Sequence, residues 1–189
     1  FLERDIQLPE GLIQEAVNYA KKGLKGKLEC QDEDTDNSEP ALLTLSMHIY
    51  RFLATVATKI PQVFPINEFI DHRKHTQSDF ELSQLIGVLR QYYLNYRQQI
   101  GNLQMKKIIQ IIIESLPICN FSVIPEPIIA IRELFDNEPN IILPKVQVVF
   151  KYINDLLEQE NEGELYYWAT MTNIVSFLCS MLNNEQTRG

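Results

Sequence analysis

The sequence predicts an all-α fold, and three observations support this prediction. Apolar residues recur at intervals of three and four along most of the chain, which is the period of a helix. Glycine is scarce, with 7 in 189 residues, and strand-length alternation bounded by turn dipeptides is rare. Prolines fall at or near most boundaries between the periodic segments. We therefore expect about seven to eight helices, joined mostly by short linkers and antiparallel to their neighbours.

The first helix is expected to begin at Pro9, because proline favours the first turn. Lysines and glycines accumulate between residues 21 and 27, where a helix C-terminus favours both. The predicted apolar stripe of this helix consists of Leu12, Ile13, Ala16, Val17, Ala20 and Leu24.

Residues 29–39, "ECQDEDTDNSE", carry no large apolar side chain and predict an acidic, exposed loop. This loop is interpreted as a solvated linker, with an acidic contact for a basic partner as the alternative. Ser38 and Pro40 then provide the cap and first turn of a helix that reaches Ile60, and Pro61 is expected to end it. That helix is apolar on most sides, which predicts a central position in the fold.

A short helix is expected after Pro65, and a long helix follows, to about Gln99. Ser78 and Glu81 form the S-x-x-E signature of a helix start. The positions expected to be buried in the long helix are Leu82, Leu85, Ile86, Leu89, Tyr92, Tyr96 and Ile100, with Tyr93 at the edge of the stripe.

The second half of the chain predicts helices at 103–116, at 128–135, from near Pro144 and from Glu164 to Leu182. The segments "CNFSVIPEP" and "DNEPNIIL" are expected as linkers. "IIQIII" and "VQVVF" are β-prone but lie in longer helical frames, so helix is favoured over strand. In the last helix, the positions expected to be buried are Leu165, Trp168, Ala169, Thr172, Ile174, Val175, Leu178, Cys179 and Leu182.

The helix lengths and the alternation of helix and short linker resemble α-solenoids of the HEAT or armadillo style. No strict repeat period is visible, and a closed helical bundle is the competing architecture. We interpret residues 1–189 as a single helical domain cut from a larger protein, because the chain starts without Met. The resemblance concerns architecture alone and implies no function.

The chain has 25 acidic and 17 basic residues, which gives a formal net charge of -8. This charge disfavours binding to bulk nucleic acid or anionic membranes unless a basic patch exists. The longest apolar run is far shorter than the ~20 residues of a membrane span. Cys30, Cys119 and Cys179 are widely spaced, which is typical of reduced thiols in the cytoplasm or nucleus. Cys119 and Cys179 lie in apolar contexts and are expected to be buried and inert.

The sequence contains no P-loop, dinucleotide-binding or nucleophile-elbow motif, so no cofactor and no catalytic residue is predicted. The best metal candidate is "DHRKH", where His72 and His75 could share a helix face near Asp71. Arg73 and Lys74 stand between these histidines and would oppose a dication. The segment is therefore interpreted as a polar helix end, and no metal site is predicted.

Residues 72–107 are basic within an acidic chain, and they include the mixed stretch "RQYYLNYRQQ". A basic segment with interleaved aromatic residues could bind an acidic or phosphorylated protein segment, or RNA. The alternative is a set of solvated helix faces that do not converge. The partner-binding candidates are Arg90, Tyr93, Leu94, Arg97, Lys106 and Lys107.

These observations favour a protein–protein interaction scaffold or adaptor over an enzyme, since helical organisation and candidate Tyr and Arg anchors occur without catalytic motifs. Two alternatives remain. The first is an RNA-binding helical domain that uses residues 72–107. The second is a non-catalytic regulatory module of an enzyme or small GTPase, in which Arg97 or Arg132 would act on the partner.

Overall fold

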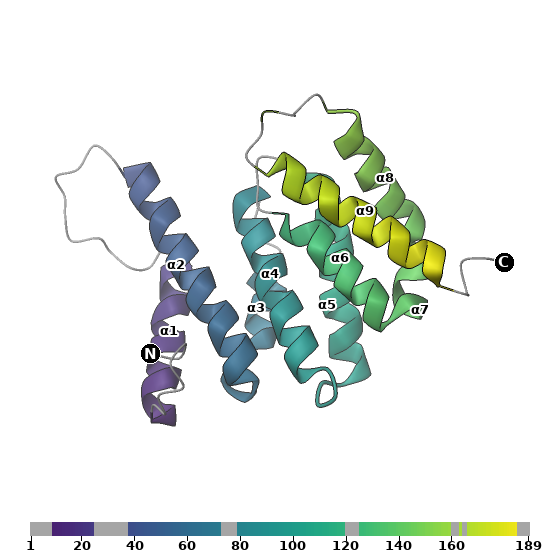
Figure 1. Cartoon of the computed structure of the whole chain (residues 1–189). Coiled ribbons are helices and arrows are strands. Elements are labelled where there is room, and N and C mark those ends of the chain that lie inside the picture. The colour runs from purple at the N-terminus through teal and green to yellow at the C-terminus, as the bar shows by residue number, and fades with distance from the viewer. Residues whose placement is uncertain are drawn as a thin grey trace. The chain divides into compact units, whose positions relative to one another are not determined.

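The computed structural model of the chain describes residues 9–24, 38–72, 79–119, 125–159, 163 and 166–184, with residues 38–45 and 72 described by their backbone alone. Within this part of the chain, every regular element is an α-helix or a short 3-10 helix, and no strand occurs (Figure 1). The predicted all-α fold class is therefore confirmed.

Helix boundaries in the described residues follow the proline pattern, because a proline stands in the first turn of α6, α7 and each 3-10 helix. The α-helices are α1 (Glu10–Leu24), α2 (Ser38–Lys59), α3 (Ile66–His72), α4 (Asp79–Tyr96), α5 (Asn102–Ser115), α6 (Glu126–Asn137), α7 (Pro139–Ile142), α8 (Val146–Leu157) and α9 (Tyr167–Asn183). The 3-10 helices are η2 (Pro61–Val63), η4 (Leu116–Ile118) and η5 (Leu143–Lys145).

Two local predictions meet different outcomes in the second half of the chain. The β-prone runs "IIQIII" and "VQVVF" lie in α5 and α8, so the prediction of helix is confirmed. The segment "DNEPNIIL" was expected to be a linker, but it contains the short helix α7. Pro139 explains this difference, because its fixed φ suits a first helical turn, and Ile142 at the end of this turn is buried.

Residue contacts divide the chain into two compact units. Unit 1 comprises Phe1–Glu68 and Val88–Gln99, and unit 2 comprises Phe69–Gly87 and Ile100–Gly189. The prediction of a single domain over 1–189 stays a prediction. Most of the predicted acidic loop at 29–39 lies outside the described residues, and α2 already begins at Ser38.

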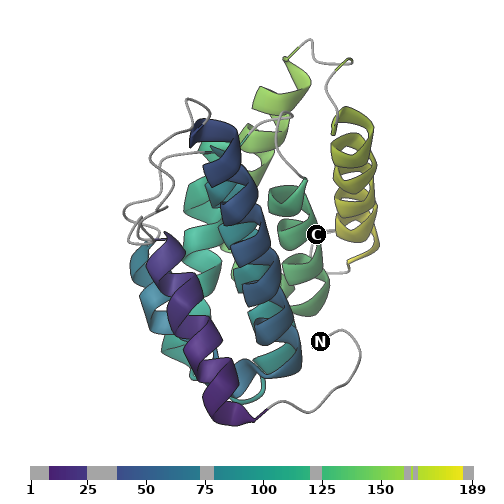
Figure 2. The same ribbon diagram turned by 90° about the vertical axis from the view of Figure 1, so that its left-hand side faces the viewer.

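Unit 1 is organised around α1 and α2, which pack side by side (Figure 2). Pro61 ends α2 as predicted, and the ring of Phe64 then lies against Tyr92 of α4 with centroids 5.2 Å apart. Burial of these apolar faces supplies the main driving force for folding the unit. Its buried residues include Ile13, Val17, Ala20, Tyr50, Leu53, Val56, Phe64 and Tyr92.

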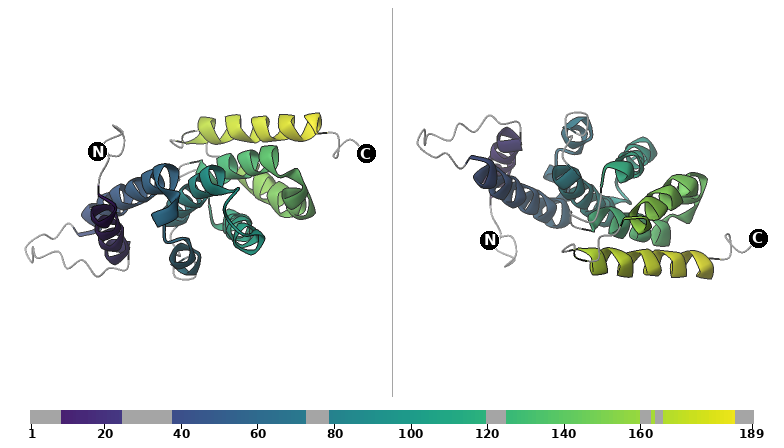
Figure 3. Two further views of the ribbon diagram at one scale, coloured as in Figure 1. Left: turned by 90° about the horizontal axis from the view of Figure 1, so that it is seen from below. Right: turned by 90° about the horizontal axis from the view of Figure 1, so that it is seen from above.

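Unit 2 is organised around α6, which packs against both α5 and α9. Figure 3 shows α9 lying along the outside of this unit, next to α6, in both views. The buried rings of Phe135 in α6 and Phe177 in α9 meet edge to face, with centroids 5.6 Å apart. Near the start of α6, the side chain of Glu126 lies over Gly87 of α4, where a Cβ would come within 3.1 Å of its carboxyl carbon. Glycine at this position permits the close approach.

Burial along α4 agrees with the sequence prediction except at Tyr93. The predicted positions Leu82, Leu85, Ile86, Leu89 and Tyr92 are all buried, and Tyr96 and Ile100 are half-buried. Tyr93 was placed at the edge of the stripe but is fully buried. The reason is that Ser83, Gly87 and Val88 are buried as well, so the middle of α4 is enclosed around most of its circumference.

Burial along α9 contradicts most of the sequence prediction. Only Ile174 of the predicted positions is buried, and Leu178 is half-buried, while Leu165 lies outside the described residues. The face packed inward is instead formed by Thr170, Ile174 and Phe177, a narrower stripe than expected. The predicted positions that are exposed are Trp168, Ala169, Thr172, Val175, Cys179 and Leu182.

The same comparison corrects one of the cysteine predictions. Cys179 was expected to be buried and is exposed, whereas Cys119 is buried as expected. Cys30 lies outside the described residues. The apolar sequence around Cys179 is misleading, because the apolar neighbours of this residue are divided between two faces of α9.

Candidate functional site

Unit 1 contains an apolar groove of about 520 Å³ between α1 and α2. Most of its wall is hydrocarbon, and its polar side chains are one carboxylate and one imidazole. The lining residues are Leu12, Glu15, Ala16, Tyr19 and Ala20 from α1, and His48, Ile49 and Phe52 from α2. We call this the α1–α2 groove.

The groove results from the order of large and small side chains on α1. Ala16 and Ala20 lie four residues apart on one face, and their methyl groups leave room between the two helices. Leu12 and Tyr19 flank them and are exposed to 52% and 63%. Ile49 of α2 is buried beneath the groove. A hollow bordered by large exposed apolar side chains can take up apolar groups of a ligand.

Besides Glu15 in its wall, the α1–α2 groove has further charged groups next to it on α1. Lys22 places its ammonium 5.5 Å from the centroid of the Tyr19 ring, a cation–π contact that helps to orient the ring. Lys21, one residue earlier, forms an ion pair with Glu68 of α3 at 2.5 Å. This pair fixes the end of α1 within unit 1. The groove therefore combines an apolar centre with a polar border.

The structure places the predicted partner-binding residues in two sets. Arg90, Leu94 and Arg97 belong to unit 1, and all three are half-buried. Lys106 and Lys107 of α5 belong to unit 2 and are exposed. Residues 73–78 of the predicted basic segment lie outside the described residues.

Tyr93 does not fit the role of a partner-binding residue, because its side chain is fully buried. The neighbouring tyrosines are also part of the protein's own packing. The rings of Tyr92 and Tyr96 lie 5.5 Å apart, and burial raises the pKa of Tyr92, with a smaller contribution from Tyr96. The mixed "RQYYLNYRQQ" stretch is therefore mainly a core segment with arginines on its accessible side.

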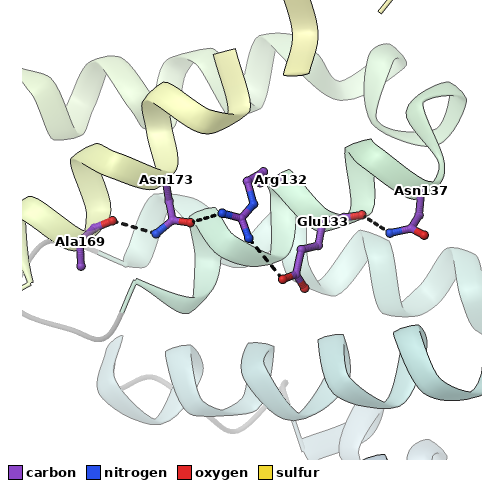
Figure 4. Close-up of polar contacts among 5 residues, drawn as sticks. All are labelled: Arg132, Glu133, Asn137, Ala169 and Asn173. Carbon is purple, nitrogen blue, oxygen red and sulfur yellow. Dashed lines mark hydrogen bonds and ion pairs between the residues drawn. The ribbon is translucent and has the colours of Figure 1, made fainter. Parts of the chain in front are cut away.

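Arg132 links α6 to α9, as Figure 4 shows. Its guanidinium donates a hydrogen bond to Oδ1 of Asn173 at 2.7 Å and lies 3.4 Å from Oε1 of Glu133. Nδ2 of Asn173 in turn donates to the carbonyl oxygen of Ala169 at 2.8 Å. Arg132 is half-buried and engaged in holding α9, which is a structural position rather than that of an exposed arginine acting on a partner enzyme.

The remaining chemical candidates do not converge in the part of the chain that the structure describes. No group of three or more His, Cys, Asp or Glu residues there could hold a metal ion. Asp71 is exposed near the end of α3, and His75 lies outside the described residues. Tyr152 and Cys119 are buried together in unit 2, where burial and the neighbouring thiol raise the pKa of Tyr152 strongly.

Comparison with known proteins adds no family assignment. No protein-family model, curated protein or solved structure matches this chain significantly. Among the described residues, none of the helices has the length and apolar character that crossing a membrane would require.

Sequence reasoning missed the α1–α2 groove. Its signal was present in the predicted stripe of the first helix, which has six apolar positions. The structure buries Ile13, Val17 and Ala20 and leaves Leu12 exposed. Some apolar stripes are wider than a single helix–helix contact requires. Such a stripe indicates that part of the apolar surface faces something other than the packed helix.

Proposed function

We propose that this chain is a protein-interaction module, a scaffold or adaptor, whose α1–α2 groove binds an amphipathic helix of a partner protein. The observation that carries the proposal is the apolar groove with exposed Leu12 and Tyr19 at its border. A helix that docks in a groove inserts apolar side chains spaced by three, four and seven residues. The volume of about 520 Å³ lies within the usual range of ~300–1,000 Å³ for ligand sites.

The expected partner helix has an apolar ridge bordered by polar residues of both charges. Glu15 on α1 and His48 on α2 lie on the two walls of the groove, and Lys22 lies beside Tyr19. Charged residues at the rim of an interface contribute to orientation and association rate more than to affinity. The affinity of the groove for the partner helix should therefore depend on the apolar contacts and vary little with salt.

The experiment uses peptides selected from a helical peptide library for binding to the whole chain. Ala16→Glu places a carboxylate in the groove, whereas Asn18→Glu adds the same charge at an exposed position of α1 outside it. We expect Ala16→Glu to weaken peptide binding by at least ~10-fold, since the charge would be desolvated, and Asn18→Glu to leave it unchanged. Fluorescence anisotropy measures the dissociation constants, and equal binding by both variants would overturn the proposal.

The basic residues supply further, electrostatic contacts in this proposal, with a separate set in each unit. Arg90 and Arg97 with Leu94 in unit 1, and Lys106 and Lys107 in unit 2, would each meet an acidic or phosphorylated segment of the partner. The competing function is RNA binding by the same residues. Titration with single-stranded RNA at low and high salt distinguishes the two, because RNA binding through these residues weakens steeply as salt rises.

We also propose an α-solenoid of the HEAT or armadillo style within an intracellular protein. Support comes from the packing of helices that are neighbours in sequence, α1 with α2 and α5 with α6. Solution scattering tests the architecture, because a solenoid is more extended than a closed bundle of equal mass. A regulatory role on an enzyme or small GTPase through Arg97 would require that Arg97→Ala abolish a measured stimulation of turnover.

A further inference from the structure

Unit 2 presents an apolar surface of its own on α9. Trp168, Val175 and Leu182 are exposed to 72%, 56% and 71%, and Thr172 and Cys179 between them are exposed as well. These five residues follow one another at intervals of four, three, four and three. We call them the α9 seam. The opposite face of the same helix, with Ile174 and Phe177, is already packed against α6.

The spacing of the α9 seam specifies what kind of element can cover it. Alternating intervals of four and three give an average of 3.5 residues, which is the repeat of two helices that pair as a coiled coil. Trp168 is held in place for such a contact, because the Tyr167 ring meets it edge to face with centroids 5.2 Å apart. The seam therefore fits a helix with a matching apolar repeat.

The lack of charged residues on α9 indicates which molecule supplies the helix that covers the α9 seam. Tyr167–Asn183 contains no charged residue, although the whole chain has a net charge of -8. A foreign partner selected by charge would find no group of opposite sign on this helix. A second copy, in contrast, presents the same patch to itself across a two-fold axis, so an uncharged patch avoids facing its own like charges.

We propose that α9 pairs with α9 of a second copy of this chain, and that the α9 seam forms the centre of a homodimer. The helix has 17 residues, or about 25 Å, which allows about five layers of side chains. One helix pair of this length lies at the low end of stable interfaces, below ~1,200 Å² in total. The dimer is therefore expected to dissociate in the micromolar range.

Analytical ultracentrifugation of the whole chain tests this proposal over roughly 1–500 µM, a range chosen to bracket a micromolar dissociation constant. We expect the mass to rise from 22.0 kDa toward twice that value as concentration increases. Val175→Glu places two carboxylates opposite each other at the seam and should weaken the dimer by at least ~100-fold. Val148→Glu changes an exposed valine of α8 outside the seam and should leave the dimer intact.

Three outcomes would overturn the homodimer. They are a wild-type mass of one chain throughout, dimerisation of Val175→Glu at the wild-type strength, and equal weakening by Val175→Glu and Val148→Glu. Circular dichroism checks that each variant folds. Should Val175→Glu unfold the protein, Leu182→Lys replaces it, because Leu182 is highly exposed and a cation suits a helix C-terminus. Ala16→Glu should leave the dimer unchanged, so the groove and the seam can fail independently.

Discussion

Helices α4 and α9 have nearly equal lengths, 18 and 17 residues, but the protein uses their apolar residues differently. In α4, the predicted stripe from Leu82 to Tyr92 is buried, and Tyr93 beside it is buried too. In α9, the inward face is formed by three residues, and the stripe predicted from the sequence is mostly exposed. One helix is enclosed, whereas the other is covered on a single narrow face.

The difference shows what an apolar stripe predicts. Periodicity indicates that a surface avoids water, but it does not say which element covers that surface. Polar side chains in α4, such as Glu81, Gln91 and Asn95, mark the side that remains accessible. Because α9 carries no charge, its two apolar faces are indistinguishable in the sequence. The face with more apolar residues was predicted to be buried, and it is the exposed one.

The largest expected effect comes from truncating the buried face of α9. Phe177→Ala removes the ring that meets Phe135 and should lower the free energy of unfolding by about 3–5 kcal/mol. Val175→Ala, two residues away on the exposed seam, should cost less than about 1 kcal/mol at concentrations where the chain is monomeric. Urea denaturation measures both values. Similar losses of stability in the two variants would mean that the two faces of α9 contribute equally to the stability of the fold.

A smaller effect is expected from the polar link that holds α9. Arg132→Ala removes the hydrogen bond to Asn173 and should destabilise the protein by about 1–2 kcal/mol. The double variant with Asn173→Ala should lose less than the sum of the two single variants, with a coupling of roughly 0.5–1.5 kcal/mol. Thr172→Ala is the control, because the Thr172 hydroxyl bonds only within α9, to the carbonyl of Trp168. Full additivity would contradict a direct link.

An effect of opposite sign is expected at Thr170, on the buried face of α9. Its hydroxyl oxygen is buried and has no hydrogen-bond partner among the described residues, whereas the buried hydroxyl of Ser115 in α5 donates to the carbonyl of Ile111 at 2.6 Å. Thr170→Val keeps the shape and removes an unpaired polar group, so stability should rise by about 1 kcal/mol. Ser115→Ala should lower it. A loss of stability in Thr170→Val, measured by thermal unfolding, would contradict this account.

The sequence predicted the elements well and the surfaces poorly, for one physical reason. Helix starts and stops depend on local chemistry, so Pro61 and the β-prone "IIQIII" run were interpreted correctly. Burial depends on neighbours distant in sequence, so Leu12 of the predicted apolar stripe and Trp168, which was predicted to be buried, are both exposed. The prediction for Tyr93 was wrong in the opposite direction, because its burial depends on how fully α4 is enclosed. Both candidate surfaces therefore appeared where a predicted stripe remained uncovered.

Of these variants, Tyr92→Phe in α4 is expected to change stability least at neutral pH. Its effect on stability becomes measurable at alkaline pH. Burial raises the pKa of Tyr92 above its ordinary value of about 10, with a smaller contribution from Tyr96. The unfolded chain therefore releases this proton at a lower pH than the folded chain. The stabilisation is fully present below about pH 10 and is lost as pH rises through the folded pKa.

Tyr92→Phe removes this titration and keeps the ring that packs against Phe64. The variant should match the wild type at pH 7 and lose less stability than the wild type between about pH 10 and 11. Tyr152→Phe should change the alkaline limb in the same direction, since burial raises the pKa of Tyr152 as well. Denaturant titrations at several pH values measure this difference. Parallel stability curves for Tyr92→Phe and the wild type would show that the Tyr92 hydroxyl is solvated, which would place the tyrosines of α4 at a surface, like Trp168 of α9.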